Sequence, residues 1–222
     1  MPDLNTIYTK LLTAYGPLHW WPAETPFEVA IGALLTQNTN WKNVEIAIDN
    51  LRREQALTPQ AIAALPRQEL EQLIRPSGFF RQKAERLQQL IEYLQSAHNG
   101  TLENLLNQPL EVARLELLQL KGIGPETADS ILLYAGNLPS FVVDAYTMRL
   151  FERLGSLIGN ETYEQVRDLF MSRLPADPER YNEYHALIVE HCKRFCRKRP
   201  LCEQCPLQTN CRYANPQARQ DP

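Results

Sequence analysis

The chain has 222 residues, of which 44% are hydrophobic and 22% are charged, and its formal net charge is −3. This length and apolar content suffice for a sizeable core and exclude a disordered tail protein. The sequence pI near 5.9 excludes a generally basic nucleic-acid binder, so any DNA affinity requires a local positive patch. No apolar run approaches the roughly 18 residues that span a bilayer, and the N-terminus lacks the regions of a signal peptide. A cytoplasmic location is therefore expected.

The N-terminal part predicts one amphipathic helix and then a break. Leu4, Ile7, Leu11 and Leu12 recur at helical spacing. The tetrapeptide His19-Trp20-Trp21-Pro22 follows, and its proline favours an extended backbone in the residue before it. Two adjacent tryptophans on a helix cannot both face one core. One or both of them line a cleft, or they cover the helical core, and the residues alone do not decide between these interpretations.

A second helix is predicted from Pro26 to about Leu35. Thr25-Pro26-Phe27-Glu28 has the form of a capping box with proline at the first helical position. The helix is apolar on most faces, which indicates burial. It ends in the polar segment 36–41, Thr-Gln-Asn-Thr-Asn-Trp. Polar side chains at the end of a core helix are candidates for functional residues.

The middle of the chain continues with helical patterns. Ser77-Gly78-Phe79-Phe80 then leads through Lys83-Ala84 into a long helix that ends near His98. The other helices expected before residue 121 are shorter and span residues 58–65, 67–74, 102–106 and 110–120.

Residues 122–125 predict a tight hairpin between two helices. Gly122 and Gly124 flank Ile123; glycine accepts positive φ and exposes its amides, and the isoleucine anchors the turn in the core. Pro125 fits the first turn of the next helix. Free N–H groups at such a turn hold phosphate oxygens without reading sequence. The pattern therefore indicates contact with a nucleic-acid backbone.

A short β-like run, Phe141-Val142-Val143, ends in Asp144, and helices follow at 145–154, 163–174 and 181–193. The chain as a whole is predicted to be all-α, with about ten helices. Asp144 has two interpretations that are compatible: it caps the helix that begins at Ala145, or its carboxylate acts on a nucleotide beside the hairpin. A helix N-terminus also keeps a carboxylate ionised.

All five cysteines lie between Cys192 and Cys211. Cys196, Cys202, Cys205 and Cys211 have the spacing C-x5-C-x2-C-x5-C, which favours an iron–sulfur cluster or a zinc ion over disulfides. Five cations lie beside them, at Lys193, Arg194, Arg197, Lys198 and Arg199. They are a candidate phosphate-binding patch; the alternative is an ordinary solvated surface.

The segments LKGIGPETA and VVDAY together resemble the helix-hairpin-helix and Gly/Pro-Asp motif of the endonuclease III-like DNA glycosylases. The cysteine loop resembles the cluster loop of that family, although the first gap is one residue short, which leaves Cys192 or Cys196 as the first ligand. The resemblance implies a two-lobed fold, with one lobe at residues 22–134, the other at 1–21 and 135–222, and a 4Fe–4S cluster loop at 192–211. It also implies that Asp144 is the catalytic residue.

The same resemblance implies roles in opening duplex DNA. Gln37 matches the glutamine that fills the gap left by an extruded base, and Phe79 matches the residue that wedges into the opposite strand. The alternatives are a polar helix C-terminus for Gln37 and a core phenylalanine for Phe79. Glu126 occupies the position of the lysine that forms a Schiff base in endonuclease III itself. Since glutamate cannot do this, the resemblance predicts a monofunctional glycosylase.

HWWP and GIGPETAD look closest to the 3-methyladenine DNA glycosylase III branch. In that branch an aromatic pocket receives alkylated purines, and Trp20, Trp21, Pro22 and Trp41 occupy its positions. The predicted protein is a monomeric base excision repair enzyme acting on double-stranded DNA with a damaged base. The alternatives are a glycosylase for oxidised or mismatched pyrimidines, a non-catalytic iron–sulfur DNA-binding protein, and an iron–sulfur redox carrier.

Overall fold

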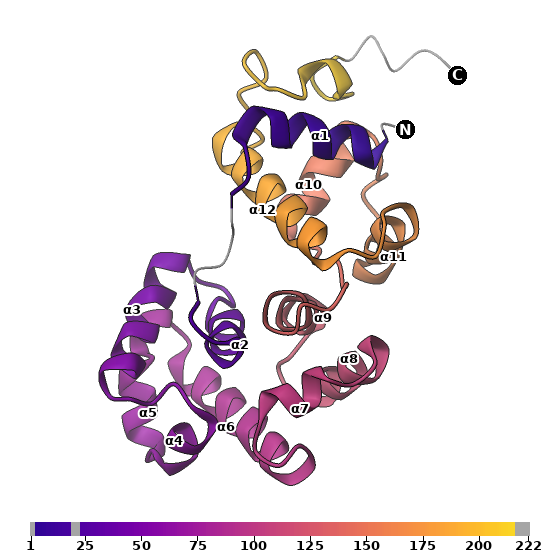
Figure 1. Cartoon of the computed structure of the whole chain (residues 1–222). Helices are drawn as coiled ribbons and strands as arrows, with labels where there is room; N and C mark the ends of the chain where they lie inside the picture. The colour runs from indigo at the N-terminus through magenta and orange to yellow at the C-terminus, as the bar shows by residue number, and fades with distance from the viewer. Residues whose placement is uncertain (1–2, 19–22, 216–222) are drawn as a thin grey trace. The chain divides into compact units, whose positions relative to one another are not determined.

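The structure is a computed structural model and describes residues 3–18 and 23–215. These residues form twelve α-helices, one π-helical turn and two short 3₁₀ turns, and no strand among them (Figure 1). The fold is all-α, as predicted. The chain divides into two compact units, one made of residues 1–20 and 139–222 and the other of residues 21–138. No helix in the described part of the chain is both long and apolar enough to cross a membrane.

The unit of residues 21–138 contains the helices from α2 to α9. Their bounds are α2 Pro26–Leu35, α3 Trp41–Arg53, α4 Pro59–Ala64, α5 Arg67–Leu73, η1 Arg75–Ser77, α6 Phe80–Ala97, α7 Leu102–Leu106, α8 Leu110–Gln119, α9 Pro125–Ser130 and η2 Ile131–Ala135. The other unit contains the remaining elements, which are α1 Leu4–Tyr15, α10 Ala145–Leu154, α11 Tyr163–Arg173, α12 Pro178–Arg194 and η3 Gln208–Asn210.

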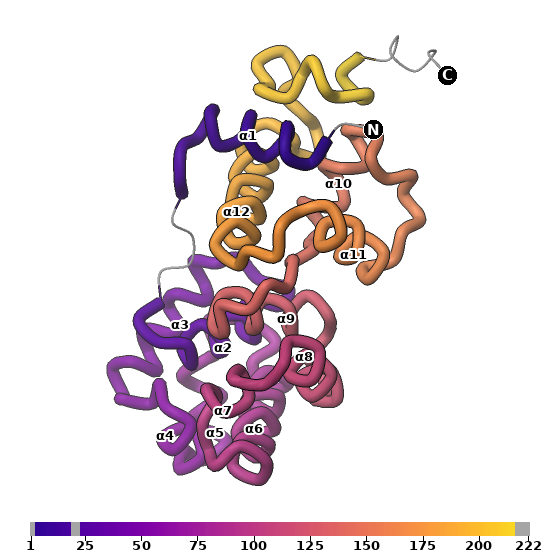
Figure 2. The backbone as a smooth tube through the Cα atoms, turned by 45° about the vertical axis from the view of Figure 1, so that its right-hand side comes forward, coloured from indigo at the N-terminus to yellow at the C-terminus, as the bar shows by residue number. Residues whose placement is uncertain are grey.

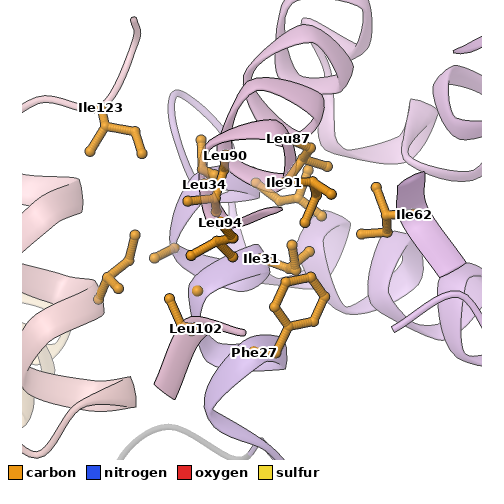
Figure 3. Packing of buried hydrophobic residues seen from close by; sticks show 14 of the residues in the cluster. Phe27, Ile31, Leu34, Ile62, Leu87, Leu90, Ile91, Leu94, Leu102 and Ile123 are labelled. Atoms are coloured by element: carbon orange, nitrogen blue, oxygen red, sulfur yellow. The ribbon is translucent and has the colours of Figure 1, made fainter. Parts of the chain in front are cut away.

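The buried helix α2 is the centre of the larger core. Phe27, Ile31 and Leu34 on α2 meet Leu87 and Ile91 on α6 (Figure 3). Nine of the ten residues of α2 are buried, because helices contact it on most sides. Burial of a large apolar side chain such as Phe27 or Ile31 contributes about 1.5–3 kcal/mol relative to exposure. This core sets the positions of the loops at the C-terminus of α2 and the N-terminus of α6.

The α8–α9 pair is joined by a buried ion pair as well as by apolar contacts. Arg114 Nε and Nη2 donate to the two carboxylate oxygens of Asp129 at 2.8 and 3.1 Å. Asp129 is fully buried and Arg114 is nearly so. A bidentate pair in this setting fixes the orientation of the two helices, because removal of either partner leaves a buried charge.

The second unit packs α1 and α10 against α12 (Figure 2). Tyr184 on α12 donates to the Leu4 carbonyl at 2.8 Å, and the Tyr15 hydroxyl lies 2.8 Å from His191 Nδ1. The resemblance implies that residues 1–21 and 135–222 form one lobe; in the structure α1 contacts α12. Because α1 and α12 are far apart in the chain, these contacts close the unit around a single core.

The structure differs from the sequence-based expectations at three places. Residues 141–143 form no strand, because no other extended segment pairs with them; they run as buried irregular chain. Helix α3 was not predicted, although Val44, Ala47, Ile48 and Leu51 have helical spacing. At Thr25 only half of the capping box forms. The Thr25 hydroxyl accepts from the Glu28 N–H at 3.1 Å, but the Glu28 carboxylate binds Arg52 at 2.7 Å.

Candidate functional site

The hairpin between α8 and α9 depends on one of its two glycines for its backbone shape. Gly122 has φ +86°, whereas Gly124 has φ −93°, which any residue adopts. Of the two glycines, only Gly122 uses the positive φ that glycine accepts. Ile123 is 5% exposed and belongs to the core cluster, as predicted (Figure 3). The hairpin is thus anchored by one apolar side chain and shaped by one glycine.

Gln37 contacts the hairpin directly. Its Nε2 donates to the Gly122 carbonyl at 3.0 Å and to the Thr127 hydroxyl at 2.9 Å, while its Oε1 accepts from Arg86 Nη1. A Cβ on Gly122 would lie 2.1 Å from Arg86 Nε, so the guanidinium rests against the bare glycine. The structure therefore brings Gln37 and the hairpin together and adds Arg86, which the sequence analysis did not select.

Phe79 lies on an exposed turn at the start of α6. Its side chain is 63% exposed, so the interpretation of Phe79 as a core residue is wrong. Gly78 and Phe79 have φ +68° and +46°. A left-handed conformation in a bulky residue is unusual and is typical of a constrained turn. The Phe79 side chain is thus an exposed apolar group on a constrained turn.

Lys83 is buried beneath this turn and is 1% exposed. Its Nζ donates to the carbonyls of Leu35 and Ser77 at 2.8 and 2.7 Å. Burial, with a smaller effect of the Arg86 charge, lowers the pKa of Lys83 to about 8. The ammonium form therefore still dominates at pH 7.

Asp144 ends an irregular segment that is held at several points. Arg167 Nε and Nη2 donate to the Ser140 hydroxyl at 3.1 and 3.0 Å, and both residues are buried. The Phe141 and Phe170 rings stack with their centroids 4.0 Å apart. The Val143 N–H donates to the Tyr163 hydroxyl at 3.4 Å. This segment has no strand partner, and side chains of α11 hold it in place.

The carboxylate of Asp144 caps α10. Its Oδ1 accepts from the Thr147 N–H at 2.7 Å and from the Thr147 hydroxyl at 3.0 Å. Its Oδ2 lies 3.5 Å from His185 Nε2, and the side chain is 13% exposed. Burial by itself raises the pKa of Asp144, but His185 and the Thr147 hydrogen bonds outweigh it and hold the pKa below its usual value. The predicted cap is present, and the same contacts keep the group ionised.

Four of the five cysteines line one cavity in the loop that follows α12. They are Cys196, Cys202, Cys205 and Cys211, and His191 and Arg153 line it with them. Arg153 Nη1 lies 3.3 Å from Cys196 Sγ, and His191 Nε2 lies 3.6 Å from Cys205 Sγ. Cys192 instead points to the Tyr146 carbonyl at 3.6 Å.

The cavity offers sulfur donors from four cysteines. Among the described residues, no three His, Cys, Asp or Glu side chains converge as ligands of a single metal. A zinc site requires four sulfurs at about 2.3 Å from one point. An iron–sulfur cluster spaces its thiolates more widely, since each binds a different iron. A hydrogen bond from Cys192 and then the charge of Arg153 lower the pKa of Cys196 to about 6 despite its burial. Four cysteines around one cavity are a donor set that suits a metal group, either an iron–sulfur cluster or a zinc ion.

The five predicted cations are all exposed, but they occupy two kinds of structure. Lys193 and Arg194 belong to the last turn of α12, whereas Arg197, Lys198 and Arg199 follow it in the loop. Arg153 on α10 donates to the carbonyls of Arg197 and Lys198 at 2.7 and 3.2 Å. The backbone of the loop cations is thus held by α10 in addition to any metal group.

Of the residues predicted to form an aromatic pocket, the structure describes one, Trp41. Trp20, Trp21 and Pro22 lie outside the described residues. Trp41 begins α3, is partly buried against the core, and donates its indole N–H to Glu45 at 2.9 Å. Trp41 and the Gln37 hairpin contacts belong to the unit of residues 21–138, whereas Asp144 and the cysteines belong to the other unit.

Comparison with known families tests the resemblance suggested by the sequence. The family model described as "HhH-GPD superfamily base excision DNA repair protein" matches residues 31–176, which include the hairpin and Asp144. The chain belongs to this superfamily. As an HhH-GPD protein it is a DNA glycosylase of base excision repair with an endonuclease III-like fold.

Individual relatives agree with this assignment. A Methanocaldococcus jannaschii protein provisionally named a DNA repair glycosylase is 50% identical over 92% of this chain and 94% of its own length. An endonuclease III in a non-covalent DNA complex has a TM-score of 0.82 and 26% identity, covering 98% of this chain and 97% of that one. The H. pylori 3-methyladenine DNA glycosylase bound to 1,N6-ethenoadenine has a TM-score of 0.74 and 30% identity, covering 87% and 98%.

Four residues that contact the predicted site residues were not selected from the sequence. They are Lys83, Arg86, Arg153 and His185. A signal existed for Lys83, since it falls on the apolar face of α6 with Ala84 and Leu87. A charge at a core position of an amphipathic helix indicates a buried role. Arg86 and Arg153 gave no such signal, because their partners come from distant parts of the chain.

Proposed function

We propose that this protein is a monofunctional DNA glycosylase that hydrolyses the N-glycosidic bond of alkylated purines such as 3-methyladenine. The observation that carries the proposal is the environment of Asp144. One oxygen is fixed by Thr147, the other lies beside His185, and the pKa is lowered, so the group is an ionised carboxylate of fixed position. Such a group is suited to stabilising a developing cation.

In the proposed reaction, positive charge builds on the deoxyribose ring as the base departs. Asp144 opposes that charge and orients a water molecule toward the anomeric carbon. The bond from sugar to base breaks, the bond from sugar to water oxygen forms, and a water proton is lost to solvent. Because the target bond is inside a duplex, the nucleotide first leaves the stack. Gln37, Phe79 and the Gly122–Gly124 hairpin are proposed to open and hold the duplex.

The absence of lyase chemistry is proposed from the positions of the candidate lysines. Glu126 stands in the first turn of α9, where endonuclease III proper has its nucleophile. Lys121 is 78% exposed and pairs with Glu85 at 3.2 Å, and Lys83 is buried with its ammonium bound to two carbonyls. A Schiff base requires a free amine beside the sugar. Neither lysine offers one in this arrangement.

The preference for alkylated purines is proposed from the indole groups. N-alkylated adenine is cationic, and the face of an indole attracts cations by about 0.5–2 kcal/mol. Its sugar bond is already weakened, so little acid catalysis is needed. The structural similarity to the H. pylori 3-methyladenine glycosylase supports this choice, and Trp41 is the described member of the proposed pocket with Trp20, Trp21 and Pro22.

We further propose that Cys196, Cys202, Cys205 and Cys211 hold a 4Fe–4S cluster, with Cys192 outside the ligand set. When bound, the cluster supplies a covalent tie across the loop and no step of the hydrolysis. Arg149 and Arg153 contribute to the same loop, since they donate to the carbonyls of Cys196 and Arg197 at 2.9 and 2.7 Å. The proposed role of the loop is to present Arg197, Lys198 and Arg199, with Lys193 and Arg194, to the DNA backbone.

The test is excision from duplexes that contain 3-methyladenine, thymine glycol or uracil, scored with and without alkali. We expect release of 3-methyladenine, strand breaks only after alkali, and no covalent adduct after borohydride. Excision of thymine glycol alone indicates the pyrimidine-specific alternative. Breaks without alkali, or a trapped adduct, contradict the monofunctional assignment.

Asp144→Asn tests the catalytic residue in the same assay. Asparagine is as good an N-cap as aspartate, so the helix α10 is retained. We expect the rate constant of excision to fall by about 10²–10³-fold while duplex binding persists. Normal excision by a folded Asp144→Asn protein removes the proposed mechanism and favours a non-catalytic DNA-binding protein.

A further inference from the structure

Lys83 presents a problem that the proposed chemistry does not solve. Its ammonium is 1% exposed, and within the described residues it binds two backbone carbonyls and no carboxylate. A buried charge without a counter-charge is costly even when its donors are satisfied. An apolar side chain of similar length would suit the apolar face of α6 at lower cost. The charge therefore has a use other than filling the core.

The two carbonyls identify that use. Leu35 is the last residue of α2, and the chain reaches Gln37 two residues later. Ser77 is the last residue of η1, and Phe79 follows two residues later. Carbonyls at helix C-termini lack intrahelical donors and carry partial negative charge, so a cation is favoured there. One ammonium thus binds the first carbonyls of two loops that are more than 40 positions apart in sequence.

We propose that Lys83 is a positioning residue for base extrusion, which fixes the Gln37 loop and the Phe79 turn relative to each other. The inference rests on the proposed function, which assigns both residues to opening the duplex. The plug and the wedge act on opposite strands of one step, so they need a fixed separation when they enter the stack. A lysine that binds the start of both loops couples their positions. If each loop were held by a different side chain, it would move with its own helix.

The strained backbone of the Phe79 turn supports the same conclusion. Gly78 and Phe79 both have positive φ, a conformation that phenylalanine rarely adopts and that surrounding contacts have to maintain. The Ser77 hydroxyl donates to the Ile74 carbonyl at 2.7 Å, and the Ser77 carbonyl accepts from Lys83. These two contacts act together with the Ser77 and Gly78 N–H groups, which donate to the Ile74 and Arg75 carbonyls at 3.0 and 3.2 Å. Loss of the Lys83 contact loosens the turn without removing Phe79 itself.

The experiment compares two duplexes with the full-length protein. In one, the alkylated base pairs with its normal partner; in the other, it lies opposite a tetrahydrofuran abasic site, where little unpairing is needed. Lys83→Met keeps the side-chain length and removes the three donors. We expect Lys83→Met to slow single-turnover excision from the paired duplex by about 10²-fold, the usual effect of a displacement near 1 Å. We expect less than about threefold slowing on the abasic duplex.

Leu90→Ala is the matched control, because Leu90 is fully buried on the same helix and its truncation weakens the fold without removing a loop contact of Lys83. It should change both rates by the same factor. A spectroscopic measurement accompanies the kinetics. 2-Aminopurine placed beside the lesion should brighten on binding of wild-type protein and of Leu90→Ala, and stay quenched with Lys83→Met, although that variant binds the duplex.

Equal slowing on both duplexes, or normal 2-aminopurine brightening with Lys83→Met, overturns the inference. Failure of the wild-type protein to excise from either duplex instead overturns the proposed function, and the fluorescence comparison still tests Lys83 in that case. If Lys83→Met does not fold, Lys83→Gln is measured in its place. Its amide reaches a single carbonyl and so uncouples the loops while retaining a polar group, and the same outcomes apply.

Discussion

At the scale of single residues, Asp144 is the N-cap of α10 and, in the proposed mechanism, also the catalytic carboxylate. Its Oδ1 satisfies two donors of Thr147 and begins α10, while Oδ2 remains beside His185 with 13% of the side chain exposed. The cap fixes the position of the carboxylate, and the donors keep it charged. The two interpretations drawn from the sequence are therefore compatible in the structure.

The pH dependence of excision follows from the lowered pKa of Asp144. The proposed mechanism uses the ionised form of Asp144, whose pKa lies below the usual 3.8. Its contribution to folding is complete above about pH 4, the unfolded pKa, and is lost as the pH falls through the lower folded value. We therefore expect no decrease of the single-turnover rate between pH 7 and pH 5. An acid limb with a midpoint above pH 5 that disappears in Asp144→Asn contradicts this expectation.

At the scale of elements, the hairpin combines a backbone requirement with a packing requirement at one position. Gly122 needs positive φ, and its missing side chain leaves the space that the Arg86 guanidinium fills. Arg86 in turn binds Gln37, which donates to the hairpin carbonyl. The glycine, the arginine and the glutamine thus form one unit that joins α6, the α2 loop and the hairpin.

Gly122→Ala should disturb this unit, and Gly124→Ala should not. A Cβ at residue 122 would be strained at φ +86° and would meet Arg86 at 2.1 Å, whereas a Cβ at residue 124 has open space and an ordinary φ. We expect Gly122→Ala to lower the free energy of unfolding by more than about 1 kcal/mol, measured in urea, and to weaken DNA binding. Similar losses in both variants, or in neither, would show that the hairpin geometry is not limiting.

The cysteine loop is the second element with a testable asymmetry. Cys196 lines the cavity with three other cysteines, whereas Cys192 does not line it; Cys192 contacts the Tyr146 carbonyl and hydrogen-bonds to Cys196. Cys196→Ala should therefore abolish broad absorption near 400 nm in anaerobically purified protein, and Cys192→Ala should retain it. Iron and zinc analysis of both proteins provides the control. A zinc-containing, colourless wild-type protein would reject the iron–sulfur assignment.

At the scale of the whole molecule, a chain with net charge −3 belongs to a family of DNA repair proteins. Its DNA affinity has to come from the placement of charge, since total charge is unfavourable. Arg197, Lys198 and Arg199 are exposed, and Arg153 holds the backbone of the first two. A local patch of this kind produces positive potential at one place, although the net charge of the whole chain is negative.

Replacement of Arg197, Lys198 and Arg199 by glutamine should change the salt dependence of duplex binding. Each lost phosphate contact reduces the slope of log K against log salt by about 0.9, so loss of all three reduces it by about 2.7. Fluorescence anisotropy at several salt concentrations measures the slope. Arg53→Gln, an exposed arginine on α3, is the control. An unchanged slope in the triple variant would show that the three cations form an ordinary solvated surface and do not contact the DNA phosphates.

Local pattern by itself predicted the hairpin and the helices other than α3. Helical periodicity, caps such as Thr25, and the Gly-Ile-Gly turn depend on neighbours within a few residues, so the sequence displays them directly. The resemblance carried by the hairpin and Asp144 also identified the family. Local pattern failed at residues 141–143, since a β-like run becomes a strand only if another segment pairs with it.

Only the tertiary structure decided which side chains meet. Lys83 joins Leu35 to Ser77, Arg86 fills the space at Gly122, and Arg153 binds carbonyls more than 40 residues away. Such contacts satisfy polar groups of one element with side chains of another, and no periodicity encodes them. The sequence thus determined the types of element and the chemistry they carry, while packing decided which buried charges hold the functional loops in place.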